Sequence, residues 1–122
     1  MAFRFALGIW AVAAVLTPVA QEAELSQARQ HFLSRRFDRA AAELRTMLVA
    51  APENSSAGYL LVRTLIEANQ PELALREAEA VVERARSESL SHVALGDARF
   101  RLADFEGAFA AYSEAVRLNA RE

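Results

Sequence analysis

The sequence predicts an all-α fold: an α-solenoid of three helix-turn-helix repeats, with six antiparallel helices, after a hydrophobic N-terminal signal or anchor helix. Three observations lead to this fold class. The segments 37–40, 71–74 and 105–108 align with one another at a constant step, and this step, about 34 residues, is typical of helical repeat proteins. Ala, Leu, Glu and Arg dominate the composition, with only 4 Gly and 3 Pro, which favours helices. No stretch alternates apolar and polar residues with the period of two typical of a strand.

The first twenty residues have the layout of an export signal. Arg4 precedes an apolar run over residues 6–16, and Ala20 stands just before a polar, acidic start at Gln21. A short positive region, an apolar core and a small residue before a polar start are typical of a secretory signal peptide. Residues 1–20 are therefore predicted to be a signal peptide or, if uncleaved, an N-terminal membrane anchor. The apolar run is shorter than the roughly 20 residues that a span usually needs, and a buried N-terminal helix is the third alternative.

The compartment follows from the first two alternatives. Residues 21–122 are then predicted to be exported, either to the periplasm or secreted, or anchored to the inner membrane and facing the periplasm. Membrane contact is expected only through residues 1–20, if they are uncleaved. All basic residues are Arg and none is Lys, a bias typical of a GC-rich and bacterial genome.

The rest of the chain divides into three repeats, 21–54, 55–88 and 89–122. Each repeat is predicted to form two helices joined by a short turn. The predicted helices cover residues 22–34, 37–50, 55–68, 71–84, 89–102 and 105–118. Apolar side chains recur at helical spacing within them, as Leu61, Leu65 and Ala68 do.

Local signals mark several helix boundaries. Pro71 suits a first helical turn, where its missing N–H costs nothing. Pro52 interrupts the chain between the first two repeats, because proline cannot continue a helix. Asp104 is predicted to cap the last helix, and Ser89 or Ser91 the helix before it.

These repeats resemble the tetratricopeptide repeat family, whose helix-turn-helix unit carries a spaced pattern of Trp, Leu-Gly, Tyr, Ala, Phe and Pro. The third repeat matches this pattern best, with His92 at the Trp position and then Leu95, Gly96, Ala108, Tyr112 and Ala115. The first repeat offers Ala28, Phe37, Ala40, Leu44 and Pro52, and the second Leu61, Val62, Ala74, Ala78 and Val81. No repeat has the Trp, and only one has the Gly. The resemblance covers residues 21–122 and implies a stack in which small residues let paired helices approach closely.

The composition excludes several functional classes. The formal net charge of −2 provides no basic field for nucleic acid. With no Cys, thiolate metal sites and Cys nucleophiles are excluded. His31 and His92 replace packing positions of the family pattern, and neither has a second His at the spacing of a helical zinc site. The sequence therefore predicts no enzyme, no cofactor and no metal.

The family resemblance implies a binding groove lined by the first helix of each repeat. Carried over position by position, the groove residues are Arg29, Phe32, Tyr59, Arg63, Ile66, Asp97, Phe100 and Arg101, with Glu22, Leu25, Leu33, Ser56, Glu67, Leu90 and Val93 at the remaining positions. Such a surface is expected to bind an extended or helical peptide, and its arginines are expected to bind carboxylates. An alternative is that Phe32, Ile66 and Phe100 complete the core. Chaperone-binding members use Asn where this chain has Arg29, Arg63 and Asp97, so that specific activity is not implied.

A second surface is predicted on the last helix. Arrays of this type normally end with a polar capping helix, and none follows the third repeat in this sequence. Phe109, Tyr112, Val116 and Leu118 are therefore expected to form an exposed apolar strip, which is typical of a contact surface. Self-association into a homo-oligomer is the hypothesis that follows.

The predicted function is a non-catalytic scaffold or adaptor of the bacterial cell envelope, binding a partner protein or peptide in its concave groove. The alternative is a self-assembling structural or docking subunit that associates through its third repeat. The chain is also compatible with being a fragment of a longer repeat protein.

Overall fold

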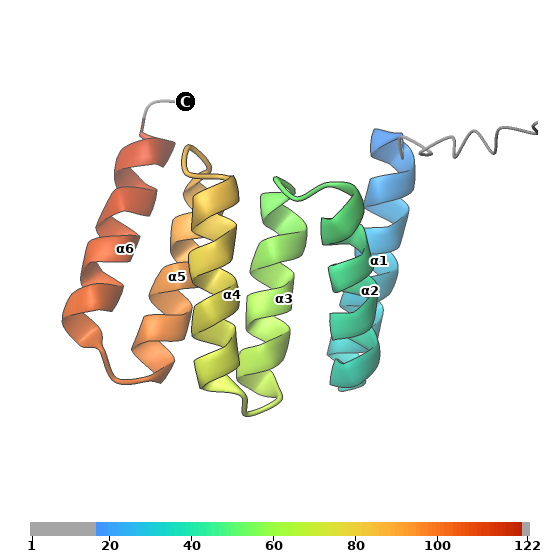
Figure 1. Ribbon diagram of the computed structural model, residues 1–122, viewed down its shortest axis with the longest axis horizontal. Helices are drawn as coiled ribbons and strands as arrows, with labels where there is room; N and C mark the ends of the chain where they lie inside the picture. Colours follow the sequence, from blue (N-terminus) through green and yellow to red (C-terminus); the bar gives the residue numbers. More distant parts are fainter. Residues whose placement is uncertain (1–16, 121–122) are drawn as a thin grey trace, which may run out of the picture.

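The computed structural model describes residues 17–120, and residues 1–16 of the expected leader over residues 1–20 lie outside this range. Within it the chain forms six α-helices and no strand. In chain order the helices are α1 (Pro18–Leu33), α2 (Phe37–Ala50), α3 (Ser55–Glu67), α4 (Pro71–Arg84), α5 (Ser89–Arg101) and α6 (Phe105–Asn119). They lie in sequence order from one end of the molecule to the other (Figure 1). The predicted all-helical solenoid of three repeats is confirmed for the described residues.

The helices pack as three antiparallel pairs that stack on one another. α1 pairs with α2, α3 with α4, and α5 with α6, while α2 meets α3 and α4 meets α5 between pairs. The first helices α3 and α5 also pack directly against each other. α6 differs from α2 and α4, because among the described helices it packs against α5 alone.

The turn inside each repeat has the same backbone conformation. Arg35, Asn69 and Ala103 have φ values of 60°, 59° and 62° and stand at the same position of the three repeats. In each turn the amide of this left-handed residue donates to the carbonyl three residues earlier, as from Asn69 to Ile66 at 3.0 Å, and the next amide reaches back five residues. This pair of bonds is a Schellman motif, which satisfies the last carbonyls of the first helix. The three repeats therefore share one turn geometry.

Side-chain caps begin three helices. Thr17, Asn54 and Asp104 each accept a hydrogen bond from an amide in the first turn that follows, so the predicted cap at Asp104 is confirmed. The predicted start of the first helix at residue 22 is wrong. α1 begins at Pro18 because Thr17 satisfies a free amide there, and proline suits a first turn. The other helix ends agree with the predictions to within one residue.

The predicted serine caps of α5 are wrong. Its N-cap residue is Glu88, which makes no side-chain cap bond. The Ser89 hydroxyl instead donates to the Ala115 carbonyl at 3.0 Å, which ties α5 to α6. Ser91 is fully buried, and its hydroxyl has no hydrogen-bond partner within the described residues.

Small residues allow the paired helices to approach closely. Ala28, Ala40, Ala74 and Ala108 are all at most 2% exposed, as the repeat pattern predicted. Gly96 is equally constrained, because a Cβ built on it would lie 2.8 Å from Cζ of Tyr112. Leucines fill the space around these contacts, with Leu44, Leu48, Leu60, Leu61, Leu65 and Leu95 all buried. The core is therefore continuous along the stack.

Within residues 17–120 we find no helix with the length and apolar character that crossing a membrane requires. Residues 18–20, which the sequence assigned to the leader, form the first turn of α1.

Candidate protein-binding groove

Two adjoining clefts lie along the first helices of the repeats. The larger has a volume of about 410 Å³ and lies between α3 and α5. The smaller, of about 290 Å³, lies between α1 and α3 and shares Arg63 and Glu67 with the larger one. The larger cleft is lined by Arg63, Ile66, Glu67, Asn69, Asp97, Phe100 and Arg101, and the smaller by Phe32, Leu33, Arg35, Phe37, Arg63 and Glu67. We call this pair of clefts the groove.

The structure brings six of the eight predicted groove residues together in these clefts. Phe32, Arg63, Ile66, Asp97, Phe100 and Arg101 line one or both of them. The other two line neither cleft: Arg29 is exposed on α1, and Tyr59 is half-buried against the core. Further along α1 and α3, a separate cleft of about 380 Å³ contains Glu22, Leu25 and Ser56, together with the acidic residues Glu53 and Glu88.

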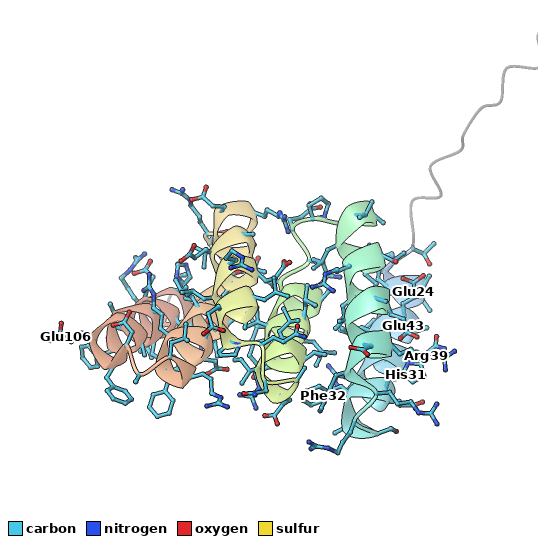
Figure 2. All side chains as sticks on the ribbon, turned by 60° about the horizontal axis from the view of Figure 1, so that its bottom comes forward. Glu24, His31, Phe32, Arg39, Glu43 and Glu106 are labelled. Carbon is cyan, nitrogen blue, oxygen red and sulfur yellow. The ribbon has the colours of Figure 1, made fainter. Side chains whose placement is uncertain are left out.

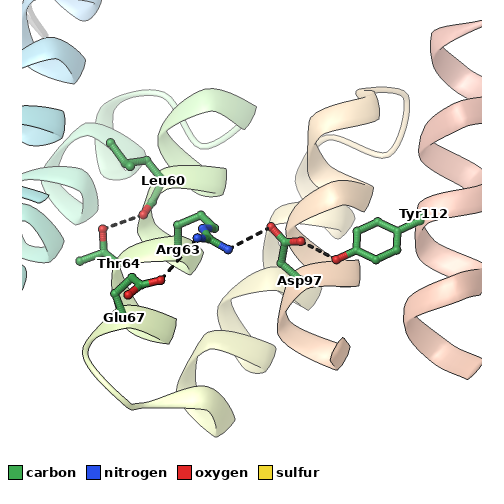
Figure 3. Close-up of polar contacts among 6 residues, drawn as sticks. All are labelled: Leu60, Arg63, Thr64, Glu67, Asp97 and Tyr112. Atoms are coloured by element: carbon green, nitrogen blue, oxygen red, sulfur yellow. Dashed lines mark hydrogen bonds and ion pairs between the residues drawn. The ribbon is translucent and has the colours of Figure 1, made fainter. Parts of the chain in front are cut away.

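Arg63 stands at the centre of the groove between two carboxylates. Its guanidinium lies 3.4 Å from Glu67, one turn further along α3, and 3.7 Å from Asp97 on α5. Figure 3 shows these contacts as one chain of polar groups running from α3 to α6. The cleft between α3 and α5 thus contains an ion pair that joins the second and third repeats.

Asp97 is held from its other side by Tyr112. The phenolic hydroxyl of Tyr112 donates to a carboxylate oxygen of Asp97 at 2.5 Å (Figure 3). Burial first, and then this hydrogen bond and the negative charge of Asp97, raise the pKa of Tyr112 well above its usual range. The Asp97 carboxylate is therefore fixed by a residue of α6 on one side and by Arg63 on the other.

The arginines are less available for carboxylates than the sequence suggested. Arg63 already faces Glu67 and Asp97, and Arg101 donates to the side-chain oxygen of Asn69 at 3.3 Å. Two arginines and two carboxylates line the larger cleft, so its local charge is balanced. A ligand in the groove is consequently selected by apolar contacts and by hydrogen-bond geometry more than by net charge.

The apolar groove residues differ in exposure. Phe100 is 59% exposed and meets Phe105 at a centroid distance of 5.4 Å, close to edge-on. Ile66 is only 8% exposed and belongs to the core. Phe32 is half-buried, with its ring tilted against Phe37 at 5.9 Å. The alternative of core packing therefore holds for Ile66, while Phe100 offers an open aromatic surface.

Asn69 is a groove residue that sequence reasoning missed. It belongs to the turn between α3 and α4, so no helical spacing pointed to it. The available signal was its residue type, because Asn adopts the left-handed conformation that the turn requires and leaves its amide free to contact a neighbouring side chain.

The predicted strip on α6 divides into two kinds of residue. Phe109 and Val116 are 75% and 69% exposed. Tyr112 and Leu118 are half-buried, and Tyr112 faces α5, because it packs over Gly96 and binds Asp97. The expected exposure of Tyr112 is therefore wrong, since the missing side chain of Gly96 provides space for its ring.

The histidines make local contacts. Nδ1 of His31 lies 2.9 Å from the carboxylate of Glu43, which connects α1 to α2 (Figure 2). Nε2 of His92 lies 2.8 Å from the carbonyl oxygen of Arg86. Across the described range, no group of three His, Cys, Asp or Glu side chains is placed to hold a metal ion.

Comparisons with solved structures show the same fold. The TPR domain of Sgt2 from Aspergillus fumigatus superposes with a TM-score of 0.75 at 24% identity, covering 85% of this chain and 68% of that one. The first TPR domain of human RPAP3 gives a TM-score of 0.74 at 19% identity, covering 87% and 84%. The second TPR domain of Spaghetti (RPAP3), bound to the HSP90 peptide SRMEEVD, gives 0.68 at 16% identity, covering 80% and 91%.

Sequence comparison reaches the same family by a separate route. Among proteins with curated sequences, none matches the chain. The sequence profile of the tetratricopeptide repeat matches residues 31–95, which is more than half of the 122 residues and includes the whole second repeat. With three repeats of equal length, identical turns and this match, the chain belongs to the tetratricopeptide repeat family.

Proposed function

We propose that this protein is a non-catalytic scaffold or adaptor that binds a partner protein or peptide in its groove. The observation that carries this proposal is the cleft of about 410 Å³ between α3 and α5, in which the exposed Phe100 lies beside the balanced charges of Arg63 and Asp97. Apolar surface next to fixed polar groups is the usual composition of a peptide site. The Spaghetti domain bound to an HSP90 peptide has the same fold and supports this class of ligand.

The groove favours a particular kind of segment. An apolar or aromatic side chain of the ligand packs on Phe100, and flanking polar groups exchange hydrogen bonds with Arg101 and Asn69. Because Arg63 is already paired with Glu67 and Asp97, a free C-terminal carboxylate is not required. An extended or helical internal segment of the partner fits these conditions.

Site-specific photo-cross-linking tests the groove. A photoreactive phenylalanine analogue in place of Phe100, in the full-length chain within its native cells, is expected to trap a discrete partner. The same analogue in place of Val49, which is 84% exposed on α2, is the matched control. A partner trapped equally well from both positions, or from neither, would exclude the groove as the binding site.

We also propose that the scaffold works in the bacterial cell envelope. The export layout of residues 1–20 and the Arg-only basic composition support this location. Cell fractionation together with the intact mass of the purified protein tests it. A mass beginning at Gln21 in a periplasmic or secreted fraction is expected for a cleaved signal, and a mass including Met1 in the inner-membrane fraction for an anchor. Recovery in the cytoplasm would contradict the proposal.

A second candidate function is a self-assembling structural or docking subunit. The exposure of Phe109 and Val116 on α6 favours it. Sedimentation equilibrium over a range of concentrations tests it, with Phe109→Glu and Val116→Glu expected to lower the average mass. A chain that stays monomeric at the highest attainable concentration would remove this candidate.

A further inference from the structure

α6 has a face that the corresponding helices of the first two repeats keep covered. α2 lies between α1 and α3, and α4 lies between α3 and α5, whereas α6 packs only on α5 among the described helices. Phe109 stands where Leu75 stands in the second repeat, and Val116 stands where Val82 stands. Leu75 and Val82 are partly buried against the core, but Phe109 and Val116 are 75% and 69% exposed. Comparison of the repeats therefore indicates that this face of α6 is suited to packing against another helix.

α1, at the opposite end of the stack, is not suited to pack on this face of α6 in a second copy. α3 packs against both helices of the preceding repeat, and its residues Ala57, Leu60, Leu61 and Thr64 are all buried. The corresponding residues of α1 are Ala23, Ser26, Gln27 and Gln30, and all four are exposed. Docking this face of a second copy onto α6 would bury two side-chain amides against phenylalanine and valine, at a cost in lost hydrogen bonds to water. A head-to-tail filament is thus disfavoured.

The exposed face of α6 is complementary to itself. At 3.6 residues per turn, one exposed stripe runs along it through Phe105, Phe109, Ser113, Val116 and Ala120. Phe109 and Val116 lie on either side of the small Ser113. Glu106 and Arg117, both exposed, flank the stripe on the same side, with opposite charges near opposite ends of the helix. Arg117 also forms an ion pair with Glu114 of its own helix, so Glu106 of a second copy would join a pair that already exists. Figure 2 places Glu106 at the α6 end of the molecule, far from the labelled residues of α1 and α2.

We propose that α6 pairs antiparallel with α6 of a second copy, about a two-fold axis close to Ser113. This pairing rests on the proposed self-association and names its contacts. With the axis between residues 112 and 113, Phe109 lies level with Val116 of the second copy, and Phe105 with Ala120. Glu106 and Arg117 of the second copy are then offset by about 3 Å along the axis at 1.5 Å per residue, within reach of an ion pair. The two-fold axis generates each of these contacts twice.

The size of the stripe predicts a weak dimer. α6 has 15 residues and is about 22 Å long at 1.5 Å per residue. One helix face of this length buries less than the roughly 800 Å² per partner of a standard stable interface. The pairing is therefore concentration-dependent, and it leaves the groove open, since the groove residues come from α1, α3, α5 and the adjoining turns.

Cysteine cross-linking tests the axis directly, because the chain has no native Cys. In the purified full-length protein, Ser113→Cys is expected to form a disulfide-linked dimer under mild oxidation, several-fold more completely than Val49→Cys, which places a thiol at another exposed site, on α2. Equal cross-linking of the two variants would overturn the pairing.

A charge exchange tests the antiparallel direction. Glu106→Arg alone and Arg117→Glu alone each place like charges opposite one another and are expected to reduce dimer formation. Mixing the two variants restores both opposite-charge contacts and is expected to recover mixed dimers, as is the double variant in one chain. If the single variants dimerise as the parent does, or if mixing restores nothing, the pairing is wrong. Association that persists in Phe109→Glu would likewise assign self-assembly to another surface while leaving self-assembly itself intact.

Discussion

The hydroxyl of Tyr112 on α6 donates a hydrogen bond to Asp97 on α5, and Asp97 lies 3.7 Å from Arg63 on α3. These contacts connect α6 with α3 of the second repeat. They fix the Asp97 carboxylate, which lines the larger cleft of the groove. Tyr112, which does not line the groove, therefore helps to position a groove residue.

Removal of the Tyr112 hydroxyl tests this connection. Tyr112→Phe loses one hydrogen bond to a charged group, and we expect the free energy of unfolding in urea to fall by about 1–2 kcal/mol. Tyr59→Phe is the matched control, because Tyr59 is also half-buried and its hydroxyl makes no hydrogen bond within residues 17–120. Equal effects of the two substitutions would show that the Asp97 contact contributes nothing.

The raised pKa of Tyr112 predicts a loss of stability in alkali. The unfolded chain releases the phenolic proton near pH 10, while the folded chain still holds it. The folded state therefore binds more protons than the unfolded state above this pH, and stability falls as the pH rises. Urea unfolding between about pH 8 and pH 11 should show this slope. In a Tyr112→Phe variant, the free energy of unfolding should fall less steeply with pH. An unchanged slope would show that Tyr112 does not cause the loss of stability.

The space above Gly96 predicts a steric effect. A methyl group there would overlap the Tyr112 ring, with Cζ at 2.8 Å, so Gly96→Ala is expected to destabilise the fold by about 1–3 kcal/mol. In the double variant with Tyr112→Leu, the added methyl group should cost clearly less than it does beside tyrosine. Additive effects in thermal or urea unfolding would mean that the two residues do not compete for the same space.

The left-handed turns predict a stabilising substitution. Ala103 has a φ of 62°, a conformation that costs an L-residue roughly 1–2 kcal/mol. Ala103→Gly is expected to raise the free energy of unfolding by up to about 1 kcal/mol, because part of the relief is lost to the greater freedom of the unfolded chain. The same change at Ala42, exposed inside α2, should lower it by about 1 kcal/mol. Destabilisation at both positions would contradict the turn geometry.

The unpartnered hydroxyl of Ser91 predicts a second stabilising substitution. Ser91 is fully buried and its Oγ has no partner within the described residues, so Ser91→Ala removes a polar group that lost its hydrogen bonds to water. We expect stability to rise by about 1 kcal/mol. Asn54→Ala, which removes the side-chain cap of α3, should instead cost about 1 kcal/mol. A loss of stability in Ser91→Ala would indicate that its hydroxyl is satisfied in solution.

Much of the groove could be predicted from the sequence, because the repeat period assigns each residue to a face of its helix. Six of eight predicted residues line the clefts for this reason. Whether these residues are free to contact a ligand could not be predicted in the same way. Arg63 is neutralised by Asp97 from another repeat, and Ile66 is buried where the equivalent Phe100 is open. Both outcomes depend on contacts between helices that lie far apart in the chain.

The sequence by itself determined the number of repeats, nearly all of the helix ends and the small residues at the close helix contacts. These features follow from local causes: the constant repeat period, helix-ending signals such as Pro52 and Asp104, and the 3.6-residue turn. Only the tertiary structure decided that Tyr112 faces Asp97 and that Ser91 is buried. The physical reason is that helical spacing places a side chain on a face, while the packing of neighbouring helices decides what that face meets.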